Sequence, residues 1–557
     1  ADDSEEEEEE EEVNSSTALR RRNISKSGRT PRRTTRFQPP PAPHPDIAGI
    51  LEPDLAYMNE PTDAQIEGLT TLITNFSDGA FNIPNGYIKT FGALTDKILV
   101  SSIQAQARHD EQTLELSVAA WQLLPGLVTR LQRLKRDKLH DLLRSWHDHE
   151  TPHTAIIHCA QQIQRQHPFT DRGKPSNKLT EDRAAELIKA GRFSALMRAI
   201  EQEQGDGPVR QSNQVMADLA TPLHPRATQE HDNIDDIHVD DNTHSISFNI
   251  HELAKSITTL PEVSASGASG WTFKLLRQLY KKEAHSLLNA NRGRRNQDPE
   301  NIPAATNTNR GIYLLLQLYT MILARQFNHR MMDRILMARL ILLPKSNGGT
   351  RPIAIGDSTL RLMLRVINTK VAKEVGKKLE PLQVAVGTSG GCEIMAALVQ
   401  HTLEQGFNET NPNEHRAVQT IDLPNAFNGV HRRSIAAGLK EHCPELLDLF
   451  KLTYASRSEL RAHTSDGRGQ LIGYSEKGCR QGDPLSMLYF AVAIHPALMK
   501  IQATLDDAHA ESTFRPRAIA YADDIALCGD PQVIINSMGD ISRHLACLVF
   551  YCWLANI

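Results

Sequence analysis

The sequence lacks the features of several common protein classes. Its 557 residues contain only 7 cysteines, with no close ligand spacing and no secretory signal, so we expect reduced thiols inside the cell. No apolar run approaches the ~20 residues of a membrane span, and we therefore expect no membrane partner. The net charge of −5 excludes a uniformly basic protein, so any basic surface must be local.

The N-terminal segment lacks the apolar residues that a core requires. Acidic residues crowd positions 2–12, basic residues follow at 20–36, and three prolines stand at 39–41. Such a segment cannot bury enough apolar surface to offset the entropy cost of ordering, so we predict disorder over residues 1–45. The basic stretch fits a nuclear-import or nucleic-acid arm, which would place the protein in the nucleus, and fits a solvated linker equally well.

The region 46–228 has a helical pattern. Apolar residues recur at the spacing of one helix face in the series Leu127, Leu131, Leu134, Leu139, Leu142 and Trp146. This periodicity predicts a helical N-terminal extension. An aspartate-containing stretch at 229–262 is interpreted as a linker into the C-terminal half of the chain.

Two adjacent carboxylates stand between two short apolar runs near the C-terminus. The tetrapeptide Tyr521-Ala522-Asp523-Asp524 predicts a tight β-hairpin with acids at its tip. Strands disfavour Asp, and neighbouring like charges raise each other's pKa, so we expect a cation there. Mg²⁺, or Mn²⁺ in its place, suits carboxylate ligands and phosphoryl transfer. The alternative is ordinary turn chemistry, in which Asp accepts hydrogen bonds from its own backbone.

A second predicted strand also ends in an acid, because the run 418–421 leads into Asp422. If this strand lies beside the hairpin in one antiparallel sheet, Asp422 and Asp523 reach the same edge. There they could share two ions about 3.5–4 Å apart, with Asp524 assisting. We therefore predict Asp422, Asp523 and Asp524 as metal ligands and catalytic residues.

Four blocks of residues carry a family resemblance. In chain order they are 343–353 (LPKSNGGTRPI), 422–427 (DLPNAF), 478–486 (GCRQGDPLS) and 521–524 (YADD). By their order and spacing the chain resembles reverse transcriptases, and within them the non-LTR (LINE-type) retrotransposon branch. The resemblance covers about residues 263–530 and is weak in the N-terminal half.

The first block places two cations beside a turn. Lys345 and Arg351 flank residues 346–350, and Arg offers a bidentate fork that phosphate oxygens accept. On these residues alone, a solvated hairpin tip is the favoured interpretation. The resemblance implies that both cations lie on polymerase fingers and contact the triphosphate of an incoming nucleotide.

The resemblance also implies a nucleotide-binding role for four further residues. Phe427 takes the position of an aromatic ring under the sugar, where it would clash with a ribose 2′-OH and select dNTPs. A buried core Phe is the alternative. Gln481 and Gly482 precede a predicted buried helix at 485–498 and would approach the nascent base pair. Tyr521 completes this set.

The predicted fold is an α+β right-hand polymerase, with fingers at 263–415 and a palm at 416–557. The fingers include a stretch rich in arginine, 310–370, that suits a phosphate backbone. The implied function is RNA-directed DNA synthesis by two-metal nucleotidyl transfer, using an RNA template, a DNA primer and dNTPs. Residues 549–557 lack the lysine-bearing strand that leads into the thumb in the family, so we expect the thumb to be missing.

Two other interpretations stay open. A decayed element would bind nucleic acid without catalysing synthesis, and a polymerase of the telomerase or intron-maturase type would share the same four blocks. The sequence does not indicate the template, the target site or the oligomeric state.

Overall fold

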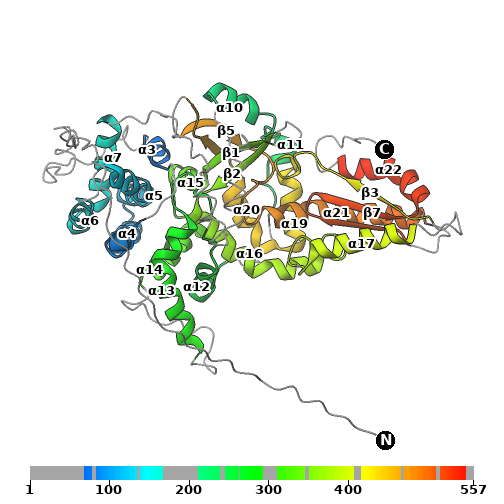
Figure 1. Ribbon diagram of the computed structural model, residues 1–557, viewed down its shortest axis with the longest axis horizontal. Coiled ribbons are helices and arrows are strands. Elements are labelled where there is room, and N and C mark those ends of the chain that lie inside the picture. Colours follow the sequence, from blue (N-terminus) through cyan, green and yellow to red (C-terminus); the bar gives the residue numbers. More distant parts are fainter. Residues whose placement is uncertain are drawn as a thin grey trace, which may run out of the picture. The chain divides into compact units, whose positions relative to one another are not determined.

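The computed structural model covers much of the predicted extension and polymerase region. The described residues (Figure 1) are 68–77, 83–134, 138–166, 211–238, 245–262, 264–292, 310–344, 350–406, 415–465, 469–509 and 515–546. The predicted disordered tail at 1–45, Lys345, and the segment 549–557 that motivated the missing-thumb expectation lie outside the described residues.

The described residues between 68 and 238 form helices and turns and contain no strand. The helices are α3 (Leu69–Phe76), α4 (Asn85–Ala107), α5 (Glu111–Leu134), α6 (Leu139–Asp148), α7 (Pro152–Gln166), α10 (Asn213–Ala220) and α11 (Gln229–Asp232). The predicted apolar series is divided between two of these helices. Leu127 and Leu131 lie on α5, Leu139 and Trp146 lie on α6, and all four side chains are buried.

Helix α5 joins these helices to the rest of the protein. The indole nitrogen of Trp271 donates to the Trp121 carbonyl oxygen at 2.9 Å. Arg334 donates to the Glu115 carboxylate at 2.9 Å, and both side chains are only 2% exposed. Removing one partner of such a buried ion pair leaves the other charge unpaired, so this contact stabilises the packing of α5 against the segment that carries Arg334.

Helices also make up most of the described residues in the remainder of the chain. They are α12 (Ile250–Thr258), α13 (Phe273–Arg292), α14 (Arg310–Leu323), α15 (His329–Leu336), α16 (Ser358–Leu379), α17 (Gly391–Gly406), α18 (Ala426–Gly429), α19 (Arg432–His442), the 3-10 turn η4 (Pro444–Leu446), α20 (Leu447–Tyr454), α21 (Ser486–Asp507) and α22 (Pro531–Ala546).

The first sheet contains the predicted hairpin of the first block. Strands β1 (Ala338–Pro344) and β2 (Thr350–Gly356) pair antiparallel, and the sheet order is β2-β1-β4-β5. Strand β4 (Ser458–Ala462) pairs parallel with β1 and antiparallel with β5 (Gln470–Ser475). Residues that lie far apart in the sequence therefore share one sheet.

The second sheet holds the predicted acidic strand and hairpin. Its order is β3-β7-β6, and both pairings are antiparallel, with β3 (Ala417–Ile421), β6 (Arg517–Tyr521) and β7 (Asp524–Gly529). Successive residues face opposite sides. Ala520 and Ile525 join the main core, on the side that carries α21 and α22, whereas Ile519 and Ala526 join a smaller cluster with α17 (Figure 1).

The sequence led us to expect no apolar run as long as a membrane span, but helix α21 has that length and composition. It is long and apolar enough to cross a membrane, although 67% of its most apolar window is buried inside the protein. The sequence predicted a buried helix over 485–498, and the helix continues beyond that stretch to Asp507. Burial on this scale is that of a core helix against which α19, α22 and β6 pack.

Candidate active site

The hairpin between β6 and β7 carries the predicted acids at its tip. Tyr521 pairs with Asp524, which leaves a loop of only two residues, Ala522 and Asp523. Ala522 has φ of 57°, in the left-handed region that residues with a Cβ rarely adopt. The prediction of a tight hairpin with a carboxylate at its turn is confirmed.

Strand β3 brings the third acid to the same edge. Ile421 pairs with Ile525 in the antiparallel ladder, so Asp422, one residue further, reaches the end of the sheet where Asp524 begins β7. Asp422 and Asp524 are exposed, and Asp523 is partly buried. The predicted arrangement of strand and hairpin in one antiparallel sheet is therefore confirmed.

The electrostatics of Asp523 reflect this convergence. Burial raises the pKa of its carboxyl group above the usual value, and the negative charges of Asp524 and Asp422 raise it further. Arg351 on β2 acts in the opposite direction, which places a guanidinium within electrostatic range of the acids. A concentration of negative charge of this kind favours the binding of a cation.

The donor chemistry of the three acids fits Mg²⁺, which prefers carboxylate oxygens. Among the residues that the structure describes, however, no group of three or more acidic, histidine or cysteine side chains is arranged to hold a metal ion. The assignment of Asp422, Asp523 and Asp524 as ligands thus stays a prediction.

Gln383 forms hydrogen bonds to the hairpin turn. The sequence did not indicate that this residue supports the site. Its fully buried side chain donates to the Ala522 carbonyl oxygen at 3.1 Å and accepts from the Ala522 N–H at 3.0 Å. The adjacent backbone also pairs with β6, because the Val384 N–H donates to the Ala520 carbonyl oxygen at 2.9 Å. One amide side chain therefore satisfies both backbone groups of the strained residue beside Asp523.

The second block turns sharply after Asp422. Asn425 adopts the left-handed conformation, with φ of 52°, and its side chain donates to the Leu223 carbonyl oxygen at 2.9 Å. Phe427 follows on α18, with 8% of its surface exposed and its ring 4.9 Å from that of Phe490. The Phe427 ring is thus packed on α21, and its predicted contact with the sugar remains a prediction.

The third block lies directly against the second block and β2. The Cys479 N–H donates to the Phe427 carbonyl oxygen at 2.8 Å. Gly478 has φ of 60°, and a Cβ there would lie 2.2 Å from that same oxygen, so only glycine fits. Gly482 has φ of 107° and faces the Ala354 carbonyl oxygen of β2. The structure therefore brings the third block between the first two.

The remaining predicted nucleotide-binding residues are only partly located. Arg351 is exposed on β2, opposite Leu343 in the hairpin. Gln481 is partly buried, and Tyr521 packs partly against the small cluster with α17. The nucleotide contacts of Arg351, Gln481 and Tyr521 stay predictions.

Part of the chain is similar to known proteins. Residues 343–547 match the family described as "Reverse transcriptase (RNA-dependent DNA polymerase)". A solved structure of telomerase from Candida albicans, in complex with a TWJ fragment of telomeric RNA, is similar at 13% identity and a TM-score of 0.28, covering 42% of this chain and 44% of that chain. The match thus spans less than half the length of that telomerase chain. No curated protein matches. The resemblance seen in the four blocks is confirmed at the level of the domain, and residues 343–547 of this chain are a reverse transcriptase domain.

Proposed function

We propose that this chain is the reverse transcriptase of a non-LTR retrotransposon, which extends a DNA primer with dNTPs on an RNA template. The observation that carries the proposal is the position of Asp422, Asp523 and Asp524 at one sheet edge, inside a reverse transcriptase domain. The non-LTR assignment rests on the sequence of the four blocks.

The site suits nucleotidyl transfer. Asp422, Asp523 and Asp524 would hold two Mg²⁺ ions, which when bound supply charge neutralisation for in-line displacement at a phosphate. Arg351, which acts electrostatically on Asp523, would offset the negative charge of the triphosphate. The primer 3′-OH would then attack the α-phosphorus, and pyrophosphate would leave. Gly482, which has no side chain, allows a base pair to approach the backbone closely.

Primer extension by the full chain tests the proposal. The assay combines an RNA template, an annealed DNA primer, complementary dNTPs and Mg²⁺. We expect the primer to grow only when all four are present, and only with the dNTP that the template specifies. An absence of Mg²⁺-dependent growth on an RNA template would contradict the proposal.

A second candidate function is nucleic-acid binding without catalysis. The observation that favours it is that Asp422, Asp523 and Asp524 are not arranged as a metal-binding group among the described residues. Binding of the RNA–DNA hybrid, measured by fluorescence anisotropy across a salt series, separates the two candidates when combined with the extension assay. Salt-sensitive binding with no extension would favour the binding function, because phosphate contacts alone give that salt dependence.

Phe427→Val should relax the exclusion of rNTPs by about tenfold or more, because the ring is proposed to reject the 2′-OH by a steric clash. Single-nucleotide incorporation with matched dNTP and rNTP measures this ratio. Phe490→Val is the control, since it removes the neighbouring ring and leaves Phe427 in place. If both variants change the ratio equally, or neither does, Phe427 acts only as a core residue.

A further inference from the structure

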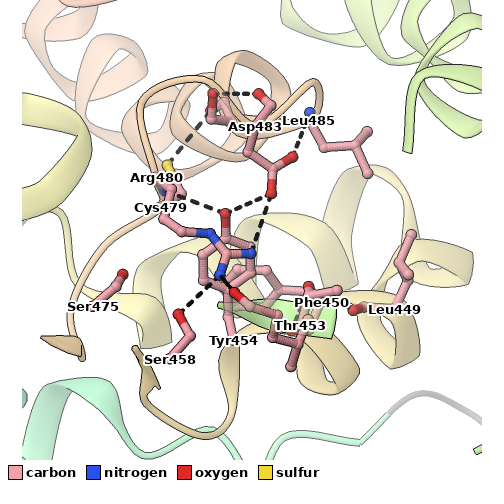
Figure 2. Close-up of polar contacts among 12 residues, drawn as sticks. Leu449, Phe450, Thr453, Tyr454, Ser458, Ser475, Cys479, Arg480, Asp483 and Leu485 are labelled. Atoms are coloured by element: carbon pink, nitrogen blue, oxygen red, sulfur yellow. Dashed lines mark hydrogen bonds and ion pairs between the residues drawn. The ribbon is translucent and has the colours of Figure 1, made fainter. Parts of the chain in front are cut away.

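A buried network of hydrogen bonds and an ion pair holds the third block, residues 478–486, in place (Figure 2). The side chain of Arg480, which is 1% exposed, donates through Nη1 to the Leu336 carbonyl oxygen and to Ser458 Oγ, both at 2.8 Å. Its Nη2 lies 3.6 Å from Asp483 Oδ2. Since a buried guanidinium is costly without partners, these contacts determine where Arg480 lies.

The hydroxyl of Tyr454 connects the parts of this network (Figure 2). It donates to Asp483 Oδ2 at 2.8 Å and accepts from the backbone N–H of Arg480 at 3.2 Å. The Arg480 guanidinium carbon also lies 4.8 Å from the centroid of the Tyr454 ring. Asp483 accepts from the Leu485 N–H at 3.0 Å, just before α21. One hydroxyl therefore ties the residue before 481–482 to the residue after it.

A second buried arginine secures the start of the same loop. Arg432 donates through Nε to the Gly478 carbonyl oxygen at 3.2 Å and through Nη2 to the Ser475 carbonyl oxygen at 3.1 Å. Its Nη1 donates to the carbonyl oxygen of Tyr454 at 2.5 Å. The loop is thus held at both ends, and Tyr454 contacts both arginines.

We propose that the Tyr454 hydroxyl is a positioning group that sets the place of Gln481 and Gly482 for nucleotide binding; this rests on the proposed polymerase function. Tyr454 is buried and acts through Arg480 and Asp483. Gly482 faces the carbonyl oxygen of Ala354 on β2, so a shift of the loop changes its fit against the β1–β2 hairpin. Small displacements of groups that position a substrate have large effects on rate.

Tyr489 offers a matched control on the adjacent helix. It is as buried as Tyr454, and the two rings lie 5.8 Å apart in an edge-to-face arrangement. Its hydroxyl has no hydrogen-bond partner among the residues that the structure describes. Tyr489→Phe therefore removes an oxygen and no observed hydrogen bond, whereas Tyr454→Phe removes an oxygen and two hydrogen bonds.

The test compares the two variants by hydrogen exchange and by steady-state primer extension on an RNA template. For Tyr454→Phe we expect faster exchange in peptides spanning 476–486 and a KM for dNTP about tenfold higher, with a smaller change in kcat. Tyr489→Phe should match the parent in both measurements. A thermal unfolding curve for each variant establishes that it is folded.

Asp483→Asn provides a second variant, because it keeps the shape of the side chain and weakens its contacts with Tyr454 and Arg480. Hydrogen exchange in the same peptides should also become faster.

Unchanged exchange in folded Tyr454→Phe and Asp483→Asn, or an equal change in Tyr489→Phe, would overturn the positioning role. So would faster exchange with an unaltered KM for dNTP. An inactive parent chain would instead contradict the polymerase function and with it the nucleotide role, while the exchange data still decide whether Tyr454 orders the loop.

Discussion

Asp523→Asn is expected to lower the rate of primer extension on the order of a thousandfold without unfolding the protein. Asn has nearly the same size as Asp but lacks the charge that a metal ligand supplies. Stabilisation of the transition state by metal ions is worth several kcal/mol, which corresponds to that loss in rate. Extension on an RNA template at saturating Mg²⁺ measures the effect.

The thermal stability of Asp523→Asn should not fall, although its rate of primer extension does. Burial, together with the charges of Asp524 and Asp422, raises the pKa of Asp523 in the folded protein. The folded state then binds this proton more tightly than the unfolded chain, so the contribution of the carboxyl to stability is lost as pH rises through the raised pKa. A neutral amide avoids that loss, and the thermal midpoint at pH 7 should not fall.

Asp507→Asn is the control, because it removes an exposed carboxylate at the end of α21. It should extend primers like the parent. The proposed role of Asp523 would be wrong if Asp523→Asn retained more than about a tenth of the parent rate, an effect too small for a lost metal ligand. A drop in rate accompanied by a lower thermal midpoint would point to unfolding instead.

Gln383→Leu should reduce extension about a hundredfold, because it releases the turn that carries Asp523. The substitution leaves the N–H and carbonyl groups of Ala522 without their present partner, at a residue already in a strained conformation. A displacement of about 1 Å in a catalytic group is enough for a loss of this size. Single-turnover extension is the appropriate measurement, since it isolates the chemical step.

Gln502 allows a closely matched control at the opposite end of β6. Its side chain donates to the Pro516 carbonyl oxygen at 2.9 Å and accepts from the Ala518 N–H at 2.9 Å. Gln502→Leu thus breaks the same kinds of bonds far along the strand from the hairpin, and it should leave the single-turnover rate within about threefold of the parent. Gln383→Glu keeps the acceptor and should lie between the parent and Gln383→Leu. Equal losses in both leucine variants would show that only the stability of β6 matters.

The strands and hairpins of the site could be predicted from local sequence. Short β-branched or apolar runs bounded by acids and turn residues indicated β3 and the β6–β7 hairpin, and both are present. The apolar stretch after Pro484 indicated a buried helix, which is α21. These features are local because alternation and helical spacing are properties of neighbouring residues. The order of the four blocks, also a property of the sequence alone, indicated the reverse transcriptase domain.

Tertiary structure alone decided which distant groups support the site. Gln383 lies 139 positions from Ala522, and no pattern around it distinguishes it from other glutamines. Tyr454, likewise, resembles any apolar residue of α20 until Arg480 and Asp483 pack against it. Periodicity predicts which side of a helix or strand is buried. The hydrogen-bond partner of a buried polar atom, however, is determined only when separate elements pack together. The sequence by itself therefore determined the chemistry of the acids and the elements that carry them, whereas packing determined what holds those acids in place.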